Sequence, residues 1–304
     1  MSYIKTTIII VNYNVTDEIR NSLHSIFASI KNDFEVIVVD NNSPDRNIES
    51  LKNLFPDVKF HFLSENLGFA KANNYAVNYS LGEILVFLNP DTILIEDFIT
   101  PIKSYMEKHP LAGACGPVLL NMDKSFQNST GIELGFIYEI CEAFMLIGVL
   151  RRIYNIWFRY KMNQHDPFEI KWLSAACMVV SKKVFCESGK FNSEFFLNYE
   201  DIDFCQRVLA SGYKNVCFPN LKCIHLDQKS QTKDLAKFIF SRYQSRLVYS
   251  KHHYKYVKRK VIRYIHIAGL LIRILITGIF YSGMESYTRT EGYKKSLKLY
   301  LNGI

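Results

Sequence analysis

The sequence lacks several patterns that define common protein classes. Its seven cysteines form no Cys-x-x-Cys pair, which argues against a zinc site or disulfides and favours buried free thiols in a reducing compartment. No Gly-rich run with basic residues, as a nucleotidyltransferase needs for a triphosphate, occurs near the N-terminus. No recognised RNA or DNA module is present, so we expect no nucleic-acid partner. The apolar run at residues 8–11 is too short for a signal peptide, and we expect a cytoplasmic protein.

The composition indicates a globular protein with an uneven distribution of charge. Hydrophobic residues make up 48% and charged residues 22% of the 304, enough for one large or two modest domains. The formal net charge is +8, and residues 242–298 are rich in Lys and Arg. A basic, aromatic C-terminal third predicts an anionic surface as partner, and we expect lipid head groups.

Alternating strand and helix patterns in the first part of the chain indicate an α/β protein with a mainly parallel sheet. Helical spacing of apolar residues predicts a helix that begins near Asp17 and a second that passes through Ala72 and Tyr79. Buried strands are predicted from β-branched or continuous apolar runs at residues 6–11, 34–39, 58–63, 84–88 and 113–120.

Three of these strands end in polar clusters, which read NYN, DNNS and NPD. The carboxyl ends of parallel strands meet at one edge of a sheet, so we expect the clusters to form a joint site. Asp40 is suited to accept the imide N–H of a pyrimidine, with backbone groups near Asn12 and Tyr13 against the base. Gly68 permits close backbone approach, and the helix after it favours phosphate. Asp91 suits a divalent cation that carries a diphosphate, although an Asx-type turn explains it equally well.

The segments IIIVNYN, VVDNNS, ENLGFAKANNYA and FLNPDT, in that order, resemble the nucleotide-sugar half of family 2 glycosyltransferases. The NPD form resembles the bacterial rhamnosyltransferase-like branch, in which Asn89 replaces the first Asp of the usual DXD motif. The resemblance implies a GT-A fold, a Rossmann-like α/β sandwich, and a Mg²⁺ or Mn²⁺ ion on Asp91. It implies donor binding by Asn12, Tyr13, Asn14, Asp40, Asn42, Asn66, Gly68, Phe69, Asn73, Asn89 and Asp91.

A second informative segment is FFLNYEDIDFCQR at residues 195–207. Ile202, Cys205 and Leu209 fall on one face of a predicted helix, which places three carboxylates in its first turn. Acidic residues at a helix start need no function, because the helix dipole stabilises them there. Crowded carboxylates also raise one another's pKa and can position a general base. The segment resembles the family's Glu-Asp motif, which implies that Asp201 removes the proton of the acceptor hydroxyl; Glu200 and Asp203 would support the site.

Two further segments are similar to the acceptor side of the family. Residues 171–180 resemble the part that closes this side of the pocket, with Trp172 and Ala176 as candidate contacts. Two short strands split by Pro219 are expected to end at His225. A lone histidine there is usually structural, but it matches a family histidine that binds the metal or the diphosphate and that is often followed by a Ser, here Ser230.

We therefore expect a GT-A catalytic domain at residues 1–235 and a helical, basic, amphipathic region at residues 236–304. Residues 1–115 would bind the nucleotide sugar and residues 116–235 the acceptor. Residues 136–160 would form either a core helix or a membrane-facing lip over the acceptor site. Residues 262–280 are apolar but contain Arg263, His266 and Arg273, so a helix on the membrane surface or packed in the protein is favoured over a membrane span.

The resemblance covers residues 5–230 and implies an inverting glycosyltransferase. The expected donor is dTDP-rhamnose, and the expected acceptor is a glycan or polyprenyl-linked glycan at the inner face of the cell membrane. A UDP-hexose donor and a non-catalytic GT-A-like scaffold are the alternatives. A homodimer is compatible with the sequence.

Overall fold

In the computed structural model of the chain, the protein contains two compact units, which are described separately below. The described residues are 6–31, 33–45, 47–226, 235–280 and 283–302; Ser230 lies outside them. The first unit comprises residues 1–131, 159–193 and 200–227, and the second comprises residues 132–158, 194–199 and 228–304. The functional division of the chain near residue 235 stays a prediction.

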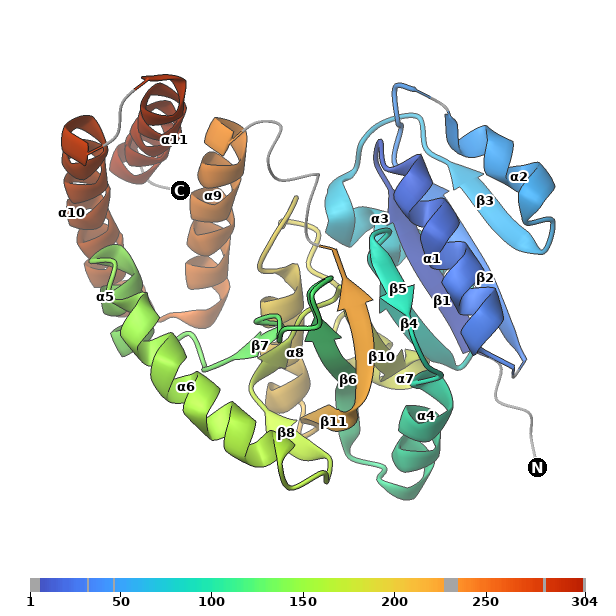
Figure 1. Cartoon of the computed structure of the whole chain (residues 1–304). Helices are drawn as coiled ribbons and strands as arrows, with labels where there is room; N and C mark the ends of the chain where they lie inside the picture. The colour runs from blue at the N-terminus through green and yellow to red at the C-terminus, as the bar shows by residue number, and fades with distance from the viewer. Residues whose placement is uncertain (1–5, 32, 46, 227–234, 281–282, 303–304) are drawn as a thin grey trace. The chain divides into compact units, whose positions relative to one another are not determined.

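The first unit contains one large sheet with the strand order β3-β2-β1-β4-β10-β6-β11-β5, and β8 pairs with β11 (Figure 1). Strands β1 to β4 run parallel to one another, β6 runs parallel to β11, and β10 is inserted antiparallel between β4 and β6. The strands are β1 Thr6–Asn12, β2 Phe34–Asp40, β3 Val58–Phe62, β4 Ile84–Leu88, β5 Thr92–Leu94, β6 Ala112–Leu120, β8 Phe168–Ile170, β10 Cys177–Ser181 and β11 Lys214–His225. A small separate sheet pairs β7 Thr130–Gly131 with β9 Trp172–Leu173.

The central strands are continuous apolar runs because both faces of the sheet are covered. Ile8 and Ile10 of β1 face a core shared with helices α1 Thr16–Ser29, α2 Leu51–Leu54 and α4 Ile99–Lys108. On the opposite face, Phe87 of β4 packs against aromatic rings that include Phe185 and Phe191. The helices of the first unit also include η1 Asn47–Ser50, α3 Gly68–Val77, α7 Lys182–Glu187 and α8 Glu200–Ala210. The expected α/β sandwich with a mainly parallel sheet is confirmed.

The structure corrects two details of the expected elements. The two short strands around Pro219 are one strand, β11, whose register shifts between Phe218 and Lys222. Proline cannot donate to the ladder, so the strand carries an irregularity there instead of ending. Helix α8 buries Phe204, Cys205 and Val208, whereas the predicted face of Ile202, Cys205 and Leu209 was correct only for Cys205.

Of the two alternatives for residues 136–160, the single core helix is wrong, and the membrane-facing lip stays a prediction. The segment forms two helices, α5 Phe136–Ala143 and α6 Ile147–Met162, and Phe158 is the one buried residue of α6. Ile153 and Ile156 of α6 are 61% and 72% exposed. Helix α6 therefore presents an apolar face to its surroundings.

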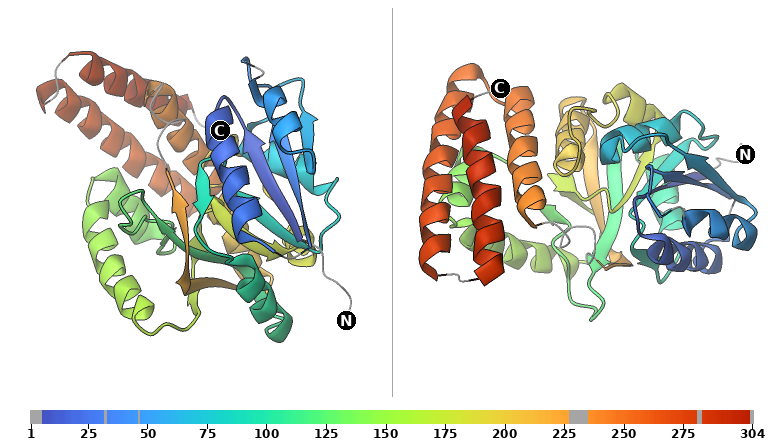
Figure 2. Two further views of the ribbon diagram at one scale, coloured as in Figure 1. Left: turned by 45° about the vertical axis from the view of Figure 1, so that its right-hand side comes forward. Right: turned by 90° about the horizontal axis from the view of Figure 1, so that it is seen from above.

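The second unit contains three long helices, α9 Leu235–His253, α10 Tyr256–Phe280 and α11 Gly283–Asn302, which lie side by side (Figure 2). Their shared core includes Tyr243, Leu270 and Tyr300. Helix α10 also crosses α5 closely at Gly269, where a Cβ atom would come within 2.4 Å of the Ala143 carbonyl oxygen. Any side chain at residue 269 would therefore force the two helices apart.

The polar residues that interrupt the apolar run of α10 all bind within this unit. Arg263 donates to the carbonyl groups of Tyr300 and Leu301, and Arg273 donates to those of Glu142 and Ala143. The His266 ring lies 2.8 Å from the carboxylate of Glu139, which is fully buried. The structure thus shows how α10 accommodates its charges: they face neighbouring helices, and apolar side chains face outward.

Glu139 is the buried anion that holds this helical unit together. Its carboxylate lies 3.4 Å from Nε of Arg246 and accepts a hydrogen bond from Tyr254. Burial alone would raise the pKa of Glu139, but the charge of Arg246 and the hydrogen bond from His266 outweigh it, and the pKa is lowered. The resulting stabilisation is fully present above the ordinary value of 4.5 and is lost as the pH falls through the lowered value.

We expect Glu139→Gln to lower the free energy of unfolding by roughly 3 kcal/mol at neutral pH, because it leaves a buried guanidinium without its partner. The matched control is Glu285→Gln, which breaks the exposed pair with Arg289 and should cost less than about 1 kcal/mol. Chemical denaturation followed by circular dichroism measures both. Equal losses of unfolding free energy in the two variants would show that the buried pair stabilises the protein no more than the exposed pair does.

Candidate active site

The register of the parallel strands brings the first two polar clusters together. Asn12 at the end of β1 lies opposite Asp40 at the end of β2, and its side-chain amide donates to Asp40 at 2.6 Å. Ser43 donates to the same carboxylate oxygen at 2.6 Å, and its backbone N–H donates to the other oxygen at 3.0 Å. The Asp40 carboxylate is therefore buried, oriented and still able to accept a further hydrogen bond.

The loop before α3 is fixed to the end of β2 by Asn41. Its side-chain nitrogen donates to the side-chain oxygen of Asn66 at 2.9 Å, and its side-chain oxygen accepts from the backbone N–H of Leu67 at 2.8 Å. Gly68 follows with φ of +77°, a conformation that a residue with a side chain rarely adopts. This loop therefore leads directly from the DNNS cluster to the start of α3.

The remaining predicted donor residues occupy several kinds of position. Tyr13 and Asn42 are exposed beside the strand ends, and both Asn14 and Asn42 adopt positive φ, which asparagine tolerates. Phe69 lies in the first turn of α3. Asn73 is buried and donates to the Phe69 carbonyl within the helix, so it braces this turn.

The third cluster is joined to His225 by the pairing of β5 with β11. Thr92, directly after Asp91, lies opposite His225. Nε2 of His225 lies 3.2 Å from Oδ1 of Asp91 and 3.1 Å from the amide nitrogen of Asn89. The structure therefore brings the predicted metal-binding pair together.

Gln127, which the sequence did not single out, orients this histidine. Its amide nitrogen donates to the carbonyl groups of Asn121 and His225, so its oxygen is the atom 2.7 Å from Nδ1 of the His225 ring. In the neutral ring the proton is thus assigned to Nδ1, and the lone pair of Nε2 faces Asp91. An imidazole nitrogen and a carboxylate oxygen directed at one point suit a divalent cation.

The metal-binding capacity of this pair is limited by its size. No group of three or more His, Cys, Asp or Glu side chains in the described part of the chain is placed to hold a metal ion alone. Mg²⁺ commonly binds through one or two carboxylates with substrate phosphates and water as its other ligands. Asp91 and His225 fit an ion that is completed by the diphosphate of a bound nucleotide.

Asp201, at the start of α8, is connected to the third cluster through residues 174–176. Its Oδ2 accepts the backbone N–H of Ala175 at 3.2 Å, while the carbonyl of Ala176 accepts the backbone N–H of Asn89 at 3.0 Å. The candidate base and the candidate metal ligands thus flank one short segment of backbone. This convergence is the central geometric feature of the site.

The carboxylates at the start of α8 have perturbed protonation. Burial raises the pKa of Asp201, although hydrogen bonds from the backbone N–H groups of Ile202 and Ala175 oppose the rise. Burial and the charge of Asp201 raise the pKa of Glu200 well above its usual range. The mutual effect predicted for the crowded carboxylates thus applies to Glu200, whereas burial alone raises the pKa of Asp201. A raised pKa makes Asp201 a stronger base once it is ionised.

Asp203 points into the protein, toward the loop after α7. It is fully buried, and Oδ2 lies 2.6 Å from Arg207, which in turn donates to the carbonyl groups of Ser188 and Lys190. The Asp203 carboxylate therefore orients an arginine that fixes this loop. Trp172, the predicted acceptor contact, lies on β9 opposite Gly131, with its ring against the glycine.

Residues 7–188 match the profile of the family described as "Glycosyl transferase family 2". The chain belongs to this family. It is similar to the dTDP-rhamnosyl transferase RfbF of Shigella flexneri, with 30% identity over 71% of this chain and 67% of that protein. It is also similar to the N-acetylglucosaminyl-diphospho-decaprenol L-rhamnosyltransferase of Mycobacterium tuberculosis (strain CDC 1551 / Oshkosh), with 22% identity over 80% of this chain and 82% of that protein.

Among solved structures, this family 2 glycosyltransferase is similar to the mannosyltransferase PcManGT of Pyrobaculum calidifontis in complex with GDP-Man and Mn²⁺. The TM-score is 0.57 at 16% identity, over 96% of this chain and 85% of that chain. The likeness confirms the expected GT-A fold. The predicted resemblance to the rhamnosyltransferase-like branch is confirmed by the relatives.

Proposed function

We propose that this glycosyltransferase transfers L-rhamnose from dTDP-rhamnose to a hydroxyl group of a lipid-linked glycan, with inversion at the anomeric carbon. The observation that carries the proposal is the position of Asp201 and of the Asn89–Asp91 turn on either side of residues 174–176. The activities that name the Shigella and Mycobacterium relatives support rhamnose as the sugar and a diphospho-lipid glycan as the acceptor.

In this proposal the first unit binds the donor through the ends of β1 and β2. Asp40, oriented by Asn12 and Ser43, accepts the N–H of the thymine or uracil ring. The loop fixed by Asn41 and Gly68 turns the chain into α3, whose N-terminus favours the negative charge of the diphosphate.

Asp91 and His225 would hold a Mg²⁺ or Mn²⁺ ion, as their converging oxygen and nitrogen atoms indicate. When bound, the ion would stabilise the negative charge that develops on the leaving nucleoside diphosphate. Gln127 keeps the Nε2 lone pair of His225 directed at this point. Asn89 contributes an amide in place of a second carboxylate, so the protein supplies one negative charge there.

Asp201 would remove the proton of the acceptor hydroxyl as its oxygen attacks the anomeric carbon. The C–O bond to the new acceptor forms while the bond to the diphosphate breaks on the opposite face, which inverts the configuration. Burial of Asp201 favours this role because a base of raised pKa binds the proton more readily. Glu200, whose pKa is raised further, is suited to stay protonated beside the charge of Asp201.

A UDP-hexose donor is the first alternative, since Asp40 recognises a feature that uracil and thymine share. A non-catalytic scaffold is the second. The oriented set of Asp40, Asp91 and Asp201 favours an enzyme over a scaffold, because a scaffold has no need of a half-buried Asp201 whose backbone partners stabilise its charge.

The second unit supports an additional proposal, that the enzyme lies on the inner face of the cell membrane. By length and composition alone, helix α10 could cross a membrane, and only 28% of its most apolar 18-residue stretch is buried in the protein. Its exposed apolar side chains follow one face at helical spacing, at Val257, Val261, Tyr264, Leu271, Leu275 and Ile279. Helix α6 has a similar exposed face with Arg151, Arg152 and Arg159 beside it. Apolar stripes with adjacent cations suit an anionic lipid surface.

The first test is transfer of sugar from dTDP-rhamnose and from UDP-glucose by the wild type and Asp201→Asn. We expect transfer from dTDP-rhamnose and a fall in kcat of at least about 10²-fold in the variant, the usual contribution of a general base. Donor binding, measured by calorimetry, should be retained. Normal transfer by the variant would refute the assigned base, and preference for UDP-glucose would refute the assigned donor.

The pH dependence of kcat gives an internal check on the same residue. Asp201 acts when ionised and its pKa is raised, so kcat should fall on the acid side at a pH above the ordinary 3.8 of aspartate.

Gln127→Leu should weaken Mn²⁺ binding in the presence of dTDP by roughly 10–100-fold, because the His225 ring loses the acceptor that orients it. Electron paramagnetic resonance of free Mn²⁺ measures the affinity. Gln127→Glu keeps an acceptor for Nδ1–H and is the matched control, with most of the affinity retained. Equal affinity in wild type and Gln127→Leu would separate His225 from the metal.

Leu275→Asp should reduce binding to vesicles that contain anionic lipid about tenfold, because one buried leucine side chain contributes about 1.5–3 kcal/mol. Leu81→Asp, at a similarly exposed leucine of the first unit, is the control and should leave binding unchanged. Co-sedimentation with vesicles measures both. Vesicle binding that neither substitution changes, together with a dimer that Leu275→Asp dissociates in light scattering, would assign this face to a second copy of the chain.

A further inference from the structure

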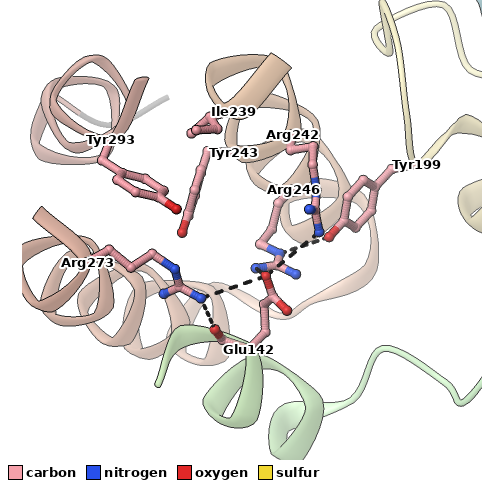
Figure 3. Close-up of a pocket in the computed structure, with 8 residues that line it drawn as sticks. All are labelled: Glu142, Tyr199, Ile239, Arg242, Tyr243, Arg246, Arg273 and Tyr293. Carbon is pink, nitrogen blue, oxygen red and sulfur yellow. Dashed lines mark hydrogen bonds and ion pairs between the residues drawn. The ribbon is translucent and has the colours of Figure 1, made fainter. Parts of the chain in front are cut away.

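The second unit contains a charged cavity that is separate from the residues assigned to donor and base. Figure 3 shows it between α5, α9, α10 and α11, with side chains from all four helices around it. Its volume is about 70 Å³. Because a single water needs roughly 10–15 Å³ on this measure, the cavity has room for several waters or one tetrahedral anion.

Positive charge dominates the wall of this cavity. Arg242, Arg246 and Arg273 surround it, and Glu142 is the one carboxylate that lines it. The nearest nitrogen of each arginine lies 3.8, 3.6 and 4.0 Å, respectively, from the Glu142 carboxylate. Glu139 adds a second carboxylate 3.4 Å from Arg246, so two negative charges face three positive ones and the cluster keeps an excess of positive charge.

Arg246 carries a buried donor nitrogen that the described residues around it do not pair. Its side chain is 3% exposed, and Nε donates to the hydroxyl of Tyr199 at 3.0 Å. Its Nη2 nitrogen is buried and has no hydrogen-bond partner among the described residues. A buried, charged donor without an acceptor is costly, and an anion in the cavity would supply the acceptor.

Tyrosine hydroxyls complete the arrangement. Figure 3 shows the hydroxyl groups of Tyr243 and Tyr293 directed toward the space beside Arg273. Planar guanidinium groups with neighbouring hydroxyl donors match the oxygen atoms of a phosphoryl group, which accept several charge-assisted hydrogen bonds at once.

We propose that this cavity binds the phosphoryl group of a phosphate ester. The identity of this ester rests on the proposed function: it is the diphosphate that joins the acceptor sugar to its lipid. Tyr199 lines the cavity and precedes Asp201 by two residues, so their Cα atoms lie at most about 7 Å apart along the chain. The head group of a membrane phospholipid has the same chemistry and is the second source.

The competing explanation is an ion-pair network that only stabilises the helices. The two explanations predict opposite effects of Glu142→Gln. If the cavity binds an anion, removing the competing carboxylate increases affinity for phosphate esters, and the ligand raises the Tm of the variant more than that of the wild type. If the network is purely structural, the variant loses stability and no ligand restores it.

The experiment is titration of the full chain with pyrophosphate in EDTA, which removes divalent cations from the donor site, with calorimetry as readout. We expect binding by the wild type, tighter binding by Glu142→Gln, and binding about tenfold weaker in Arg242→Gln, the loss of one charge-assisted interaction. Arg242 is 41% exposed, so this variant should fold where a change of buried Arg246 would not. The matched control, Arg289→Gln on the surface of α11, should bind as the wild type does.

The proposal is overturned if pyrophosphate does not bind, or if Arg242→Gln and Glu142→Gln bind it as the wild type does. Two further arms identify the source. A raised KM for N-acetylglucosaminyl-diphospho-decaprenol in Arg242→Gln, with the donor KM unchanged, supports the acceptor diphosphate. If Arg242→Gln instead binds more weakly than the wild type to phosphatidylcholine vesicles that contain phosphatidic acid, and both KM values are unchanged, the bound phosphoryl group is that of a lipid head group. Pyrophosphate binding without rhamnose transfer would sink the proposed function alone, and transfer without pyrophosphate binding would sink this inference alone.

Discussion

The parallel pairing of β1 with β2 and β4 is the constraint on which the donor side of the site depends. This register places Asn12 opposite Asp40, and the buried carboxylate of Asp40 takes its orientation from Asn12 and Ser43. A slip of one residue would move Asp40 away from these donors and leave a buried charge with too few hydrogen bonds, at a cost of about 1–3 kcal/mol for each one lost. The apolar strands thus fix the position of the polar groups that follow them.

The antiparallel strand β10, inserted beside β4, positions the residues of the proposed acceptor side relative to this sheet. Because Cys177 pairs with Leu88, the residues just before β10 lie beside the turn that follows β4. Ala176 accepts the N–H of Asn89, and Ala175 donates to Asp201. The proposed leaving-group contacts, Asn89 and Asp91, and the proposed base, Asp201, are therefore positioned by one strand pairing, although they lie more than a hundred residues apart in the sequence. Changes in β10 should disturb both together.

Sequence patterns were sufficient where one local cause determines the structure. Buried strands such as β4 are continuous apolar runs, and the polar groups at their ends follow from the parallel topology. The predicted face of α8 was wrong because Asp203 is buried and pairs with Arg207. The buried face of the helix therefore includes a carboxylate that the apolar pattern does not reveal. Gln127 carries no signal, since its role depends on a histidine 98 residues away. Helix α11 lies within the region predicted to be helical, but its bounds were not predicted, because it is mostly polar and buries small groups such as Gly292 and Ser296 against its neighbours.

The second unit follows a different rule, in which charges face inward and apolar side chains face outward. Arg263 and Arg273 of α10 bind backbone carbonyl groups, and His266 binds the carboxylate of Glu139. Burying charge in this way costs free energy that apolar side chains of the same size would not require. A unit selected only for stability has no reason to gather three arginines around two carboxylates, Glu139 and Glu142, and to leave a buried nitrogen of Arg246 without a hydrogen-bond partner in the described part of the chain. An anion bound in the interior would offset the excess of buried positive charge, and lipid at the exterior would cover the exposed apolar side chains. Both features that are unfavourable in the isolated unit would then be stabilised by a ligand.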